Sequence, residues 1–167
     1  MEVTIEQQPG TEAKHIFYKG GFDLYFLSES PVENKFKCIV QAKSRTPMTH
    51  YHENFDEIVQ CLKGVLTVMI DGKSHYLKPG ETVTIPKGAV HQIANKTDGT
   101  VEFLCEIRPG IFGYDYFRDI EPIVNAPGLP DIERLQKVMK NHGLVPVIGL
   151  KQSIIFAIIR IIRVFKK

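Results

Sequence analysis

The feature that most constrains the fold is a series of short apolar runs, separated by closely spaced turn signals, between residues 35 and 108. The interruptions are Gly64, Asp71-Gly72, Pro79-Gly80 and Pro86-Lys87-Gly88. An Asp-Gly pair between two such runs is a strong signal for a tight hairpin. Short strands with turns this regular favour an antiparallel barrel or sandwich. We therefore expect a mainly β fold.

Alternation within these runs predicts which side chains face the core. Successive side chains of a strand point to opposite faces of its sheet, so residues of one parity share a face. In two of the runs the apolar residues of one parity are Phe36, Cys38, Val40 and Ala42, and Val101, Phe103, Cys105 and Ile107. Two weaker strands are expected at 15–18 and 24–27. Four residues could line a pocket or simply fill the core, and parity does not decide between these roles: Val40, Val59, Cys61 and Phe103.

The pattern changes after residue 109, where helical spacing replaces alternation. We predict helices over 114–124 and 131–142, the second with Asp131 as its N-cap and with Gly143 just beyond its end. The chain is therefore divided into peripheral N-terminal strands (1–34), a barrel core (35–109) and a C-terminal helical extension (110–167).

Charge and cysteine content exclude some classes of protein. A formal net charge of +2 over 167 residues is too small to indicate nucleic acid binding by the whole chain. The three cysteines are odd in number and have apolar neighbours, which is typical of reduced, buried thiols in a cytoplasmic protein. The first residues lack a basic stretch followed by an apolar run, so we expect no secretory signal. We also expect no membrane-spanning helix, because no apolar run reaches about 20 residues.

The segment 150–167 is the most apolar part of the chain. On a helical wheel it has a broad apolar sector, with Arg160, Arg163 and Lys167 on the narrow remaining side. One interpretation is a helix lying in a membrane surface with a basic edge, which would give the protein peripheral membrane contact. The other, which we favour, is a helix that packs against the barrel or against a second subunit of a homodimer.

Two histidines one residue apart form the first candidate site. In an extended segment the side chains of His50 and His52 lie on one face, roughly 6–7 Å apart, and can chelate a metal. Taken alone, the pair could equally be surface histidines of an ordinary loop. If the fold also brings Glu57 and His91 to the same point, three imidazoles and a carboxylate suit Fe, Mn, Ni, Co or Zn. Glu53 and Asp56 compete with Glu57, and spacing gives Glu57 only a modest advantage.

The sequence resembles the cupin superfamily over residues 35–108. The first cupin motif has two histidines one residue apart, then a glutamate and a glycine, and is matched by His50, His52, Glu57 and Gly64. The second motif is matched at every fixed position by Gly80, Pro86, Gly88, His91 and Asn95. The short segment between the motifs looks like that of compact microbial cupins. The C-terminal part is similar to that of small bacterial cupins with a helical extension.

The resemblance implies a double-stranded β-helix, or jelly-roll barrel, with a divalent metal held in its mouth by His50, His52, Glu57 and His91. Gly64 and Gly80 are expected to adopt positive φ at turns. The first functional hypothesis is a metal-dependent enzyme acting on a small organic molecule. Chemistry like that of flavonol-cleaving dioxygenases is preferred, with Glu57 leaving the metal to act as a base, and isomerase or cyclase chemistry would use the same site. The alternative is a non-catalytic cupin that senses or stores a metabolite or metal.

Overall fold

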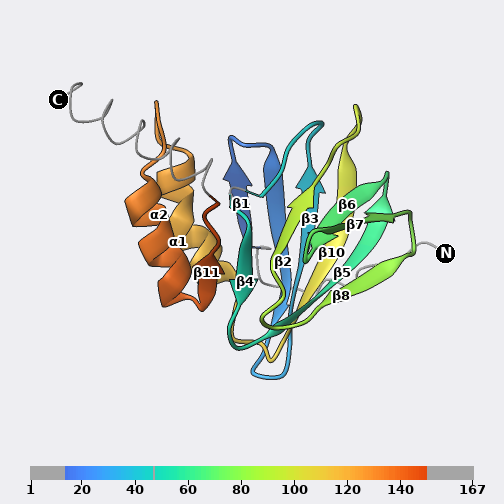
Figure 1. The fold of residues 1–167 in the computed structure, drawn as a ribbon, viewed down its shortest axis with the longest axis horizontal. Coiled ribbons are helices and arrows are strands. Elements are labelled where there is room, and N and C mark those ends of the chain that lie inside the picture. Colours follow the sequence, from blue (N-terminus) through green and yellow to red (C-terminus); the bar gives the residue numbers. More distant parts are fainter. Residues whose placement is uncertain (1–13, 47, 150–167) are drawn as a thin grey trace.

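Two antiparallel sheets face each other in the computed structural model, which describes residues 14–46 and 48–149 (Figure 1). The six-stranded sheet has the order β1 (His15–Tyr18), β2 (Phe22–Glu29), β3 (Asn34–Val40), β10 (Val101–Arg108), β5 (Asp56–Lys63) and β8 (Thr82–Ile85). The five-stranded sheet has the order β11 (Leu144–Pro146), β4 (His50–His52), β9 (His91–Ala94), β6 (Leu66–Ile70) and β7 (Lys73–Leu77). The predicted double-sheet, mainly β fold is confirmed.

The central strand β10 shows why the parity argument succeeds. It pairs with β3 on one side and β5 on the other, so its backbone is satisfied on both edges. Its alternate residues Val101, Phe103, Cys105 and Ile107 are all buried, as predicted. When only one face of a strand is buried, only the residues of that face need to be apolar, so the sequence indicates which side chains point to the core.

Gly64 shows what the motif glycines do. Its φ is +80°, a backbone conformation that residues with a Cβ rarely adopt. Gly80 has φ +90°, so the positive φ expected at both positions is confirmed. A Cβ at Gly64 would also lie 2.9 Å from Cγ2 of Val101 and 3.1 Å from the carbonyl oxygen of Thr100. The end of β5 thus turns where no larger residue fits without displacing β10.

Three strands were not predicted from the sequence. β7 is exposed along nearly its whole length, so it has no alternation to detect. β9 has four residues and follows the turn signal Pro86-Lys87-Gly88 closely, and β11 has three residues, one of them Pro146. β11 pairs with β4, the strand that carries His50 and His52. The C-terminal extension therefore contributes a strand as well as helices.

Both helices form where the sequence predicts them. α1 covers Tyr114–Val124 and α2 covers Ile132–Asn141. The side chain of Asp131 accepts a hydrogen bond from the backbone N–H of Arg134 at 3.1 Å, as an N-cap does. α1 contacts β1 and α2 contacts β11, so the pair stands beside one edge strand of each sheet (Figure 1). Neither helix is long and apolar enough to cross a bilayer.

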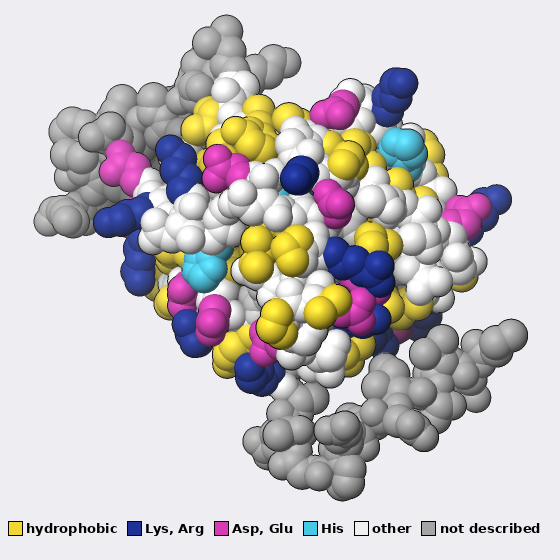
Figure 2. Space-filling model, turned by 90° about the horizontal axis from the view of Figure 1, so that it is seen from below, with side chains coloured by type: hydrophobic (Ala, Val, Ile, Leu, Met, Phe, Trp, Pro, Cys, Tyr) yellow, Lys and Arg dark blue, Asp and Glu magenta, His cyan; other side chains and the backbone are white. Residues whose placement is uncertain are grey.

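The two interpretations of 150–167 concern residues outside the described part of the chain. Within that part, the three cysteines are buried and unpaired, as expected. Figure 2 shows the lower end of the molecule, where acidic and basic side chains are intermixed with small apolar patches. This face therefore presents no large field of one sign.

Candidate metal centre

Three histidines converge between the sheets. His50 and His52 lie on β4, and His91 lies on β9 directly opposite His50. The ring nitrogens that could bind a metal, one from each histidine, all lie within 4.8 Å of one another. All three are buried, and His52 and His91 each expose only 1% of their surface. The arrangement removes the surface-loop interpretation of the histidine pair, since loop histidines would be solvated.

Backbone carbonyls fix the orientation of two of these rings. Nδ1 of His50 lies 2.9 Å from the carbonyl oxygen of Met48, and Nδ1 of His91 lies 3.0 Å from that of Ala89. Because a carbonyl oxygen can only accept, each Nδ1 must be the donor. In the neutral imidazole the Nε2 lone pair is then free to bind a metal, which is the usual way that proteins orient metal-binding histidines.

Two buried ring nitrogens lack a hydrogen bond of good geometry among the described residues, although one of them, on His91, lies 3.4 Å from a carboxylate oxygen of Glu57. They are Nε2 of His91 and Nδ1 of His52. A buried polar atom without a partner is costly and needs an explanation. An Nε2 atom that is directed into a cluster of three imidazoles has the environment expected of a metal ligand. The residues present therefore fit a divalent transition metal.

Glu57 approaches the cluster from the opposite sheet. Its Oε2 lies 3.5 Å from Nε2 of His52 and 3.4 Å from Nε2 of His91. Its Oε1 accepts a hydrogen bond from Sγ of Cys105 at 3.0 Å. The competing acids lie elsewhere: Glu53 is exposed, and Asp56 accepts a hydrogen bond from the backbone N–H of Lys87. Of the three acids, the fold thus places only Glu57 beside the histidines, which the spacing of residues in the sequence could not determine.

Burial and mutual charge set the protonation of the metal-free cluster. Burial lowers the pKa of His50 to about 4 and that of His52 to about 3. Burial acts to raise the pKa of Glu57, but His91 and His52 outweigh it and lower that pKa to about 2. Burial acts to lower the pKa of His91, but Glu57 outweighs it and raises that pKa. Two neutral imidazoles thus face a His91–Glu57 ion pair, whose proton a metal would displace.

A cavity of about 360 Å³ opens from the cluster. Apart from the cluster itself, its walls are mainly apolar side chains of both sheets and both helices, among them Leu24, Phe36, Phe103, Ile120, Leu135 and Met139. Of the four candidates left open by the sequence, Phe103 lines this cavity, while Val40, Val59 and Cys61 are buried away from it. The sequence did not predict that α1 and α2 form one wall of the cavity. Amphipathic spacing indicates that a helix buries one face, but it does not indicate which surface that face packs against.

Tyr116 of α1 is a further residue that the sequence did not reveal. It is 6% exposed and lines the cavity, where its ring packs on Phe112 with centroids 4.7 Å apart. Burial raises its pKa, and the nearby charge of Glu57 raises that pKa further. The extension therefore brings a neutral phenol close to the candidate metal centre. In the sequence, its place on the apolar face of α1 was the sole signal.

Comparisons with known proteins agree with this architecture. The family described as "Cupin domain" matches residues 36–106. An uncharacterized protein from Aquifex aeolicus is 34% identical over 92 residues, which cover 55% of this chain and 73% of that protein.

Solved structures similar to this chain share its fold at low sequence identity. KdgF from Halomonas sp. aligns with a TM-score of 0.53 at 17% identity, covering 57% of this chain and 86% of its own. A sugar phosphate isomerase from Silicibacter pomeroyi aligns with a TM-score of 0.51 at 21% identity, covering 57% and 71%. An RmlC-like cupin from Shewanella frigidimarina aligns with a TM-score of 0.53 at 13% identity, covering 64% and 92%. These likenesses concern the fold alone.

Proposed function

The chain belongs to the cupin superfamily, and we propose that it is a metal-dependent enzyme that acts on a small organic molecule, with dioxygenase-like oxidation as its chemistry. The observation that carries the proposal is the apolar cavity that ends at three buried histidines and Glu57. A concave, mostly apolar pocket with a few convergent polar groups is the usual form of a small-molecule site.

The cavity walls favour a substrate less polar than the sugar phosphate named for one structural relative. A sugar presents hydroxyl groups on every side, and each one buried without a partner carries a free-energy penalty. The walls formed by residues such as Phe36, Ile120 and Leu135 offer no hydrogen bonds from their side chains. An aromatic or aliphatic substrate is therefore a better match than a sugar phosphate.

The metal, held by His50, His52, His91 and Glu57, would supply Lewis acidity and one-electron redox chemistry. Glu57 is placed to take a proton from the substrate, since its Oε2 faces the cluster while Cys105 holds its Oε1. Tyr116 is neutral at physiological pH and can donate a hydrogen bond to a substrate oxygen. The apolar walls exclude water, which strengthens these polar interactions.

The test is to purify the protein without oxygen, measure bound metal by elemental analysis, and follow oxygen consumption with flavonols, diketones and catechols. We expect one metal ion per chain and turnover of at least one of these classes. His91→Ala should abolish both, while the matched variant His75→Ala, on the exposed strand β7, should retain both.

Two other outcomes would each change the proposal. Stoichiometric metal without turnover of any compound would favour a non-catalytic cupin that binds a metabolite or metal. Full metal occupancy in His91→Ala would reject the assignment of the metal centre itself.

A further inference from the structure

The cavity has a charged mouth as well as a metal-binding end. Among its lining residues Gly20, Arg45 and Pro130 are exposed, whereas Glu57 and the three histidines are buried. Solvent therefore meets the cavity beside Arg45 and the segment that joins α1 to α2, and the candidate metal centre lies at the inner end.

The distance between the two ends follows from the strand register. Arg45 forms an isolated bridge with Ala94, and His50 pairs with His91 on the same strand, β9. Three residues of extended chain separate His91 from Ala94, a distance of about 10 Å.

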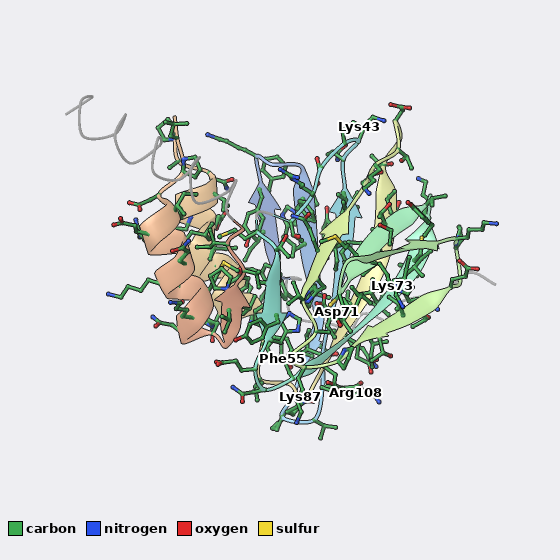
Figure 3. The ribbon with its side chains drawn as sticks, viewed as in Figure 1. Lys43, Phe55, Asp71, Lys73, Lys87 and Arg108 are labelled. Atoms are coloured by element: carbon green, nitrogen blue, oxygen red, sulfur yellow. The ribbon has the colours of Figure 1, made fainter. Side chains whose placement is uncertain are left out.

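Figure 3 shows that this direction runs along the sheets. Lys43 is at the upper end, and Phe55, whose ring stacks on His52 at 4.1 Å between centroids, is at the lower end. The cavity thus extends from the segment after Lys43 towards the histidines.

Arg45 has no ion pair or hydrogen bond from its side chain within residues 14–46 and 48–149. Its neighbour Lys43, in contrast, pairs with Asp98 at 2.8 Å, and no acidic side chain is within ion-pair distance of Arg45 among the described residues. The Arg45 guanidinium thus leaves its donors available at the edge of an apolar cavity. Its planar fork of donors matches the two oxygens of a carboxylate.

The charge balance of the cavity favours the same kind of ligand. Among the described residues that line it, Glu57 is the only acidic side chain, and a divalent metal together with Arg45 would outweigh that single negative charge. Excess positive charge between apolar walls attracts an anion and disfavours a cationic molecule.

We propose that the natural ligand is an amphipathic organic acid whose carboxylate pairs with Arg45 at the mouth while its apolar body extends towards the three histidines. The inference rests on the proposed function, because both place the substrate in this cavity. At about 360 Å³ the cavity falls within the range of roughly 300–1,000 Å³ that is usual for small-molecule pockets, so it can hold such an apolar body.

The probe is decanoate, a ten-carbon acid whose chain is comparable to the span of the cavity, and decanamide is its neutral counterpart. Binding of each is measured by titration calorimetry on the full chain after removal of metal, below the micellar concentration. We expect Arg45→Gln to weaken decanoate binding about fivefold and to leave decanamide unchanged, as loss of a partly exposed ion pair would. Arg134→Gln is the matched control, because Arg134 is exposed on α2 and does not line the cavity.

Three results would overturn the inference. Decanoate could fail to bind, Arg45→Gln could lose as much affinity for decanamide as for decanoate, or Arg134→Gln could lose as much affinity for decanoate as Arg45→Gln does. Because binding of the probe is measured on metal-free protein, the result for the ligand class does not depend on whether the protein is a metal-dependent enzyme. Loss of metal binding and oxygen consumption with an intact Arg45 effect would reject the enzyme and leave the ligand class standing. Metal-dependent turnover without the Arg45 effect would reject only the ligand class.

Discussion

At the scale of single residues, the candidate centre depends on how each ligand is held by its neighbours. Backbone carbonyls orient His50 and His91, and the Cys105 thiol orients Glu57. Such contacts beyond the ligands are worth roughly 10- to 100-fold in metal affinity in other proteins. Of these three hydrogen-bond partners, only the Cys105 thiol belongs to a side chain and can be replaced by mutation.

Cys105→Val should weaken metal binding by about tenfold, because it removes the donor that holds Oε1 of Glu57. Cys105→Ser, which keeps a donor, should lose much less. Co²⁺ titration followed by visible absorption measures the affinity. Cys61→Val makes the same change at a buried cysteine whose thiol donates to the backbone carbonyls of Lys63 and Gly64, and it should bind Co²⁺ normally. Equal losses in both valine variants would show that Cys105 acts only through packing.

The lowered histidine pKa values predict how the stability of the metal-free protein depends on pH. The unfolded chain takes up protons at His50 and His52 near pH 6.5, whereas the folded chain does so only near pH 4 and 3. Stability is therefore present above pH 6.5 and falls as the pH drops below it, and the raised pKa of His91 offsets part of this loss.

Urea unfolding should detect a net loss on the order of 2 kcal/mol between pH 7 and pH 5. His52→Asn should show a shallower dependence on pH, because one of the two titrating imidazoles is gone. His75→Gln should match the unaltered protein. A midpoint that stays constant or rises on acidification would contradict the predicted protonation of the cluster.

At the scale of elements, the end of β9 is tied to β3 by one buried amide. Asn95 is 1% exposed, and its Nδ2 donates to the carbonyl oxygens of Val40 at 3.0 Å and Gly99 at 2.7 Å. Its Oδ1 accepts from the backbone N–H of Thr97 at 2.9 Å. The motif asparagine therefore holds together the loop after the strand that carries His91.

Asn95→Asp should reduce the free energy of unfolding by about 3 kcal/mol or more. The substitution has almost no effect on volume, but it replaces two donors with a negative charge opposite carbonyl oxygens. Urea denaturation at pH 7 measures the change. Asn141→Asp, at the exposed end of α2, should stay within about 0.5 kcal/mol of the unaltered protein. Similar effects in both variants would argue against the network.

At the scale of the whole molecule, the candidate ligands join the two sheets. Glu57 belongs to the six-stranded sheet, and the three histidines belong to the five-stranded one. A metal bound by both would cross-link the sandwich at a single point. Side chains of both helices line the cavity that leads to this point, and Tyr116 of α1 is close enough for the charge of Glu57 to raise its pKa.

Zn²⁺ at 100 times its dissociation constant should stabilise the folded chain by about 2.7 kcal/mol and raise Tm by roughly 5 to 10 °C. Thermal unfolding followed by circular dichroism measures the shift. Glu57→Ala should reduce the shift and His91→Ala should abolish it, because each loses a ligand. His75→Ala should show the full shift. A shift that survives both ligand substitutions would mean that the ion binds elsewhere.

The sequence by itself determined the strands with one buried face, both helices, and the histidines that meet. Each of these leaves a local trace: alternation in β10, a cap at Asp131, or fixed spacing between His50 and His52. Only the tertiary structure placed Glu57 rather than Glu53 or Asp56 beside the imidazoles, since that choice depends on how two sheets face each other. It also revealed β7, β11 and the helical wall with Tyr116. Exposed edges and surfaces shared by distant segments have no local pattern, because the contacts that define them join residues far apart in the chain.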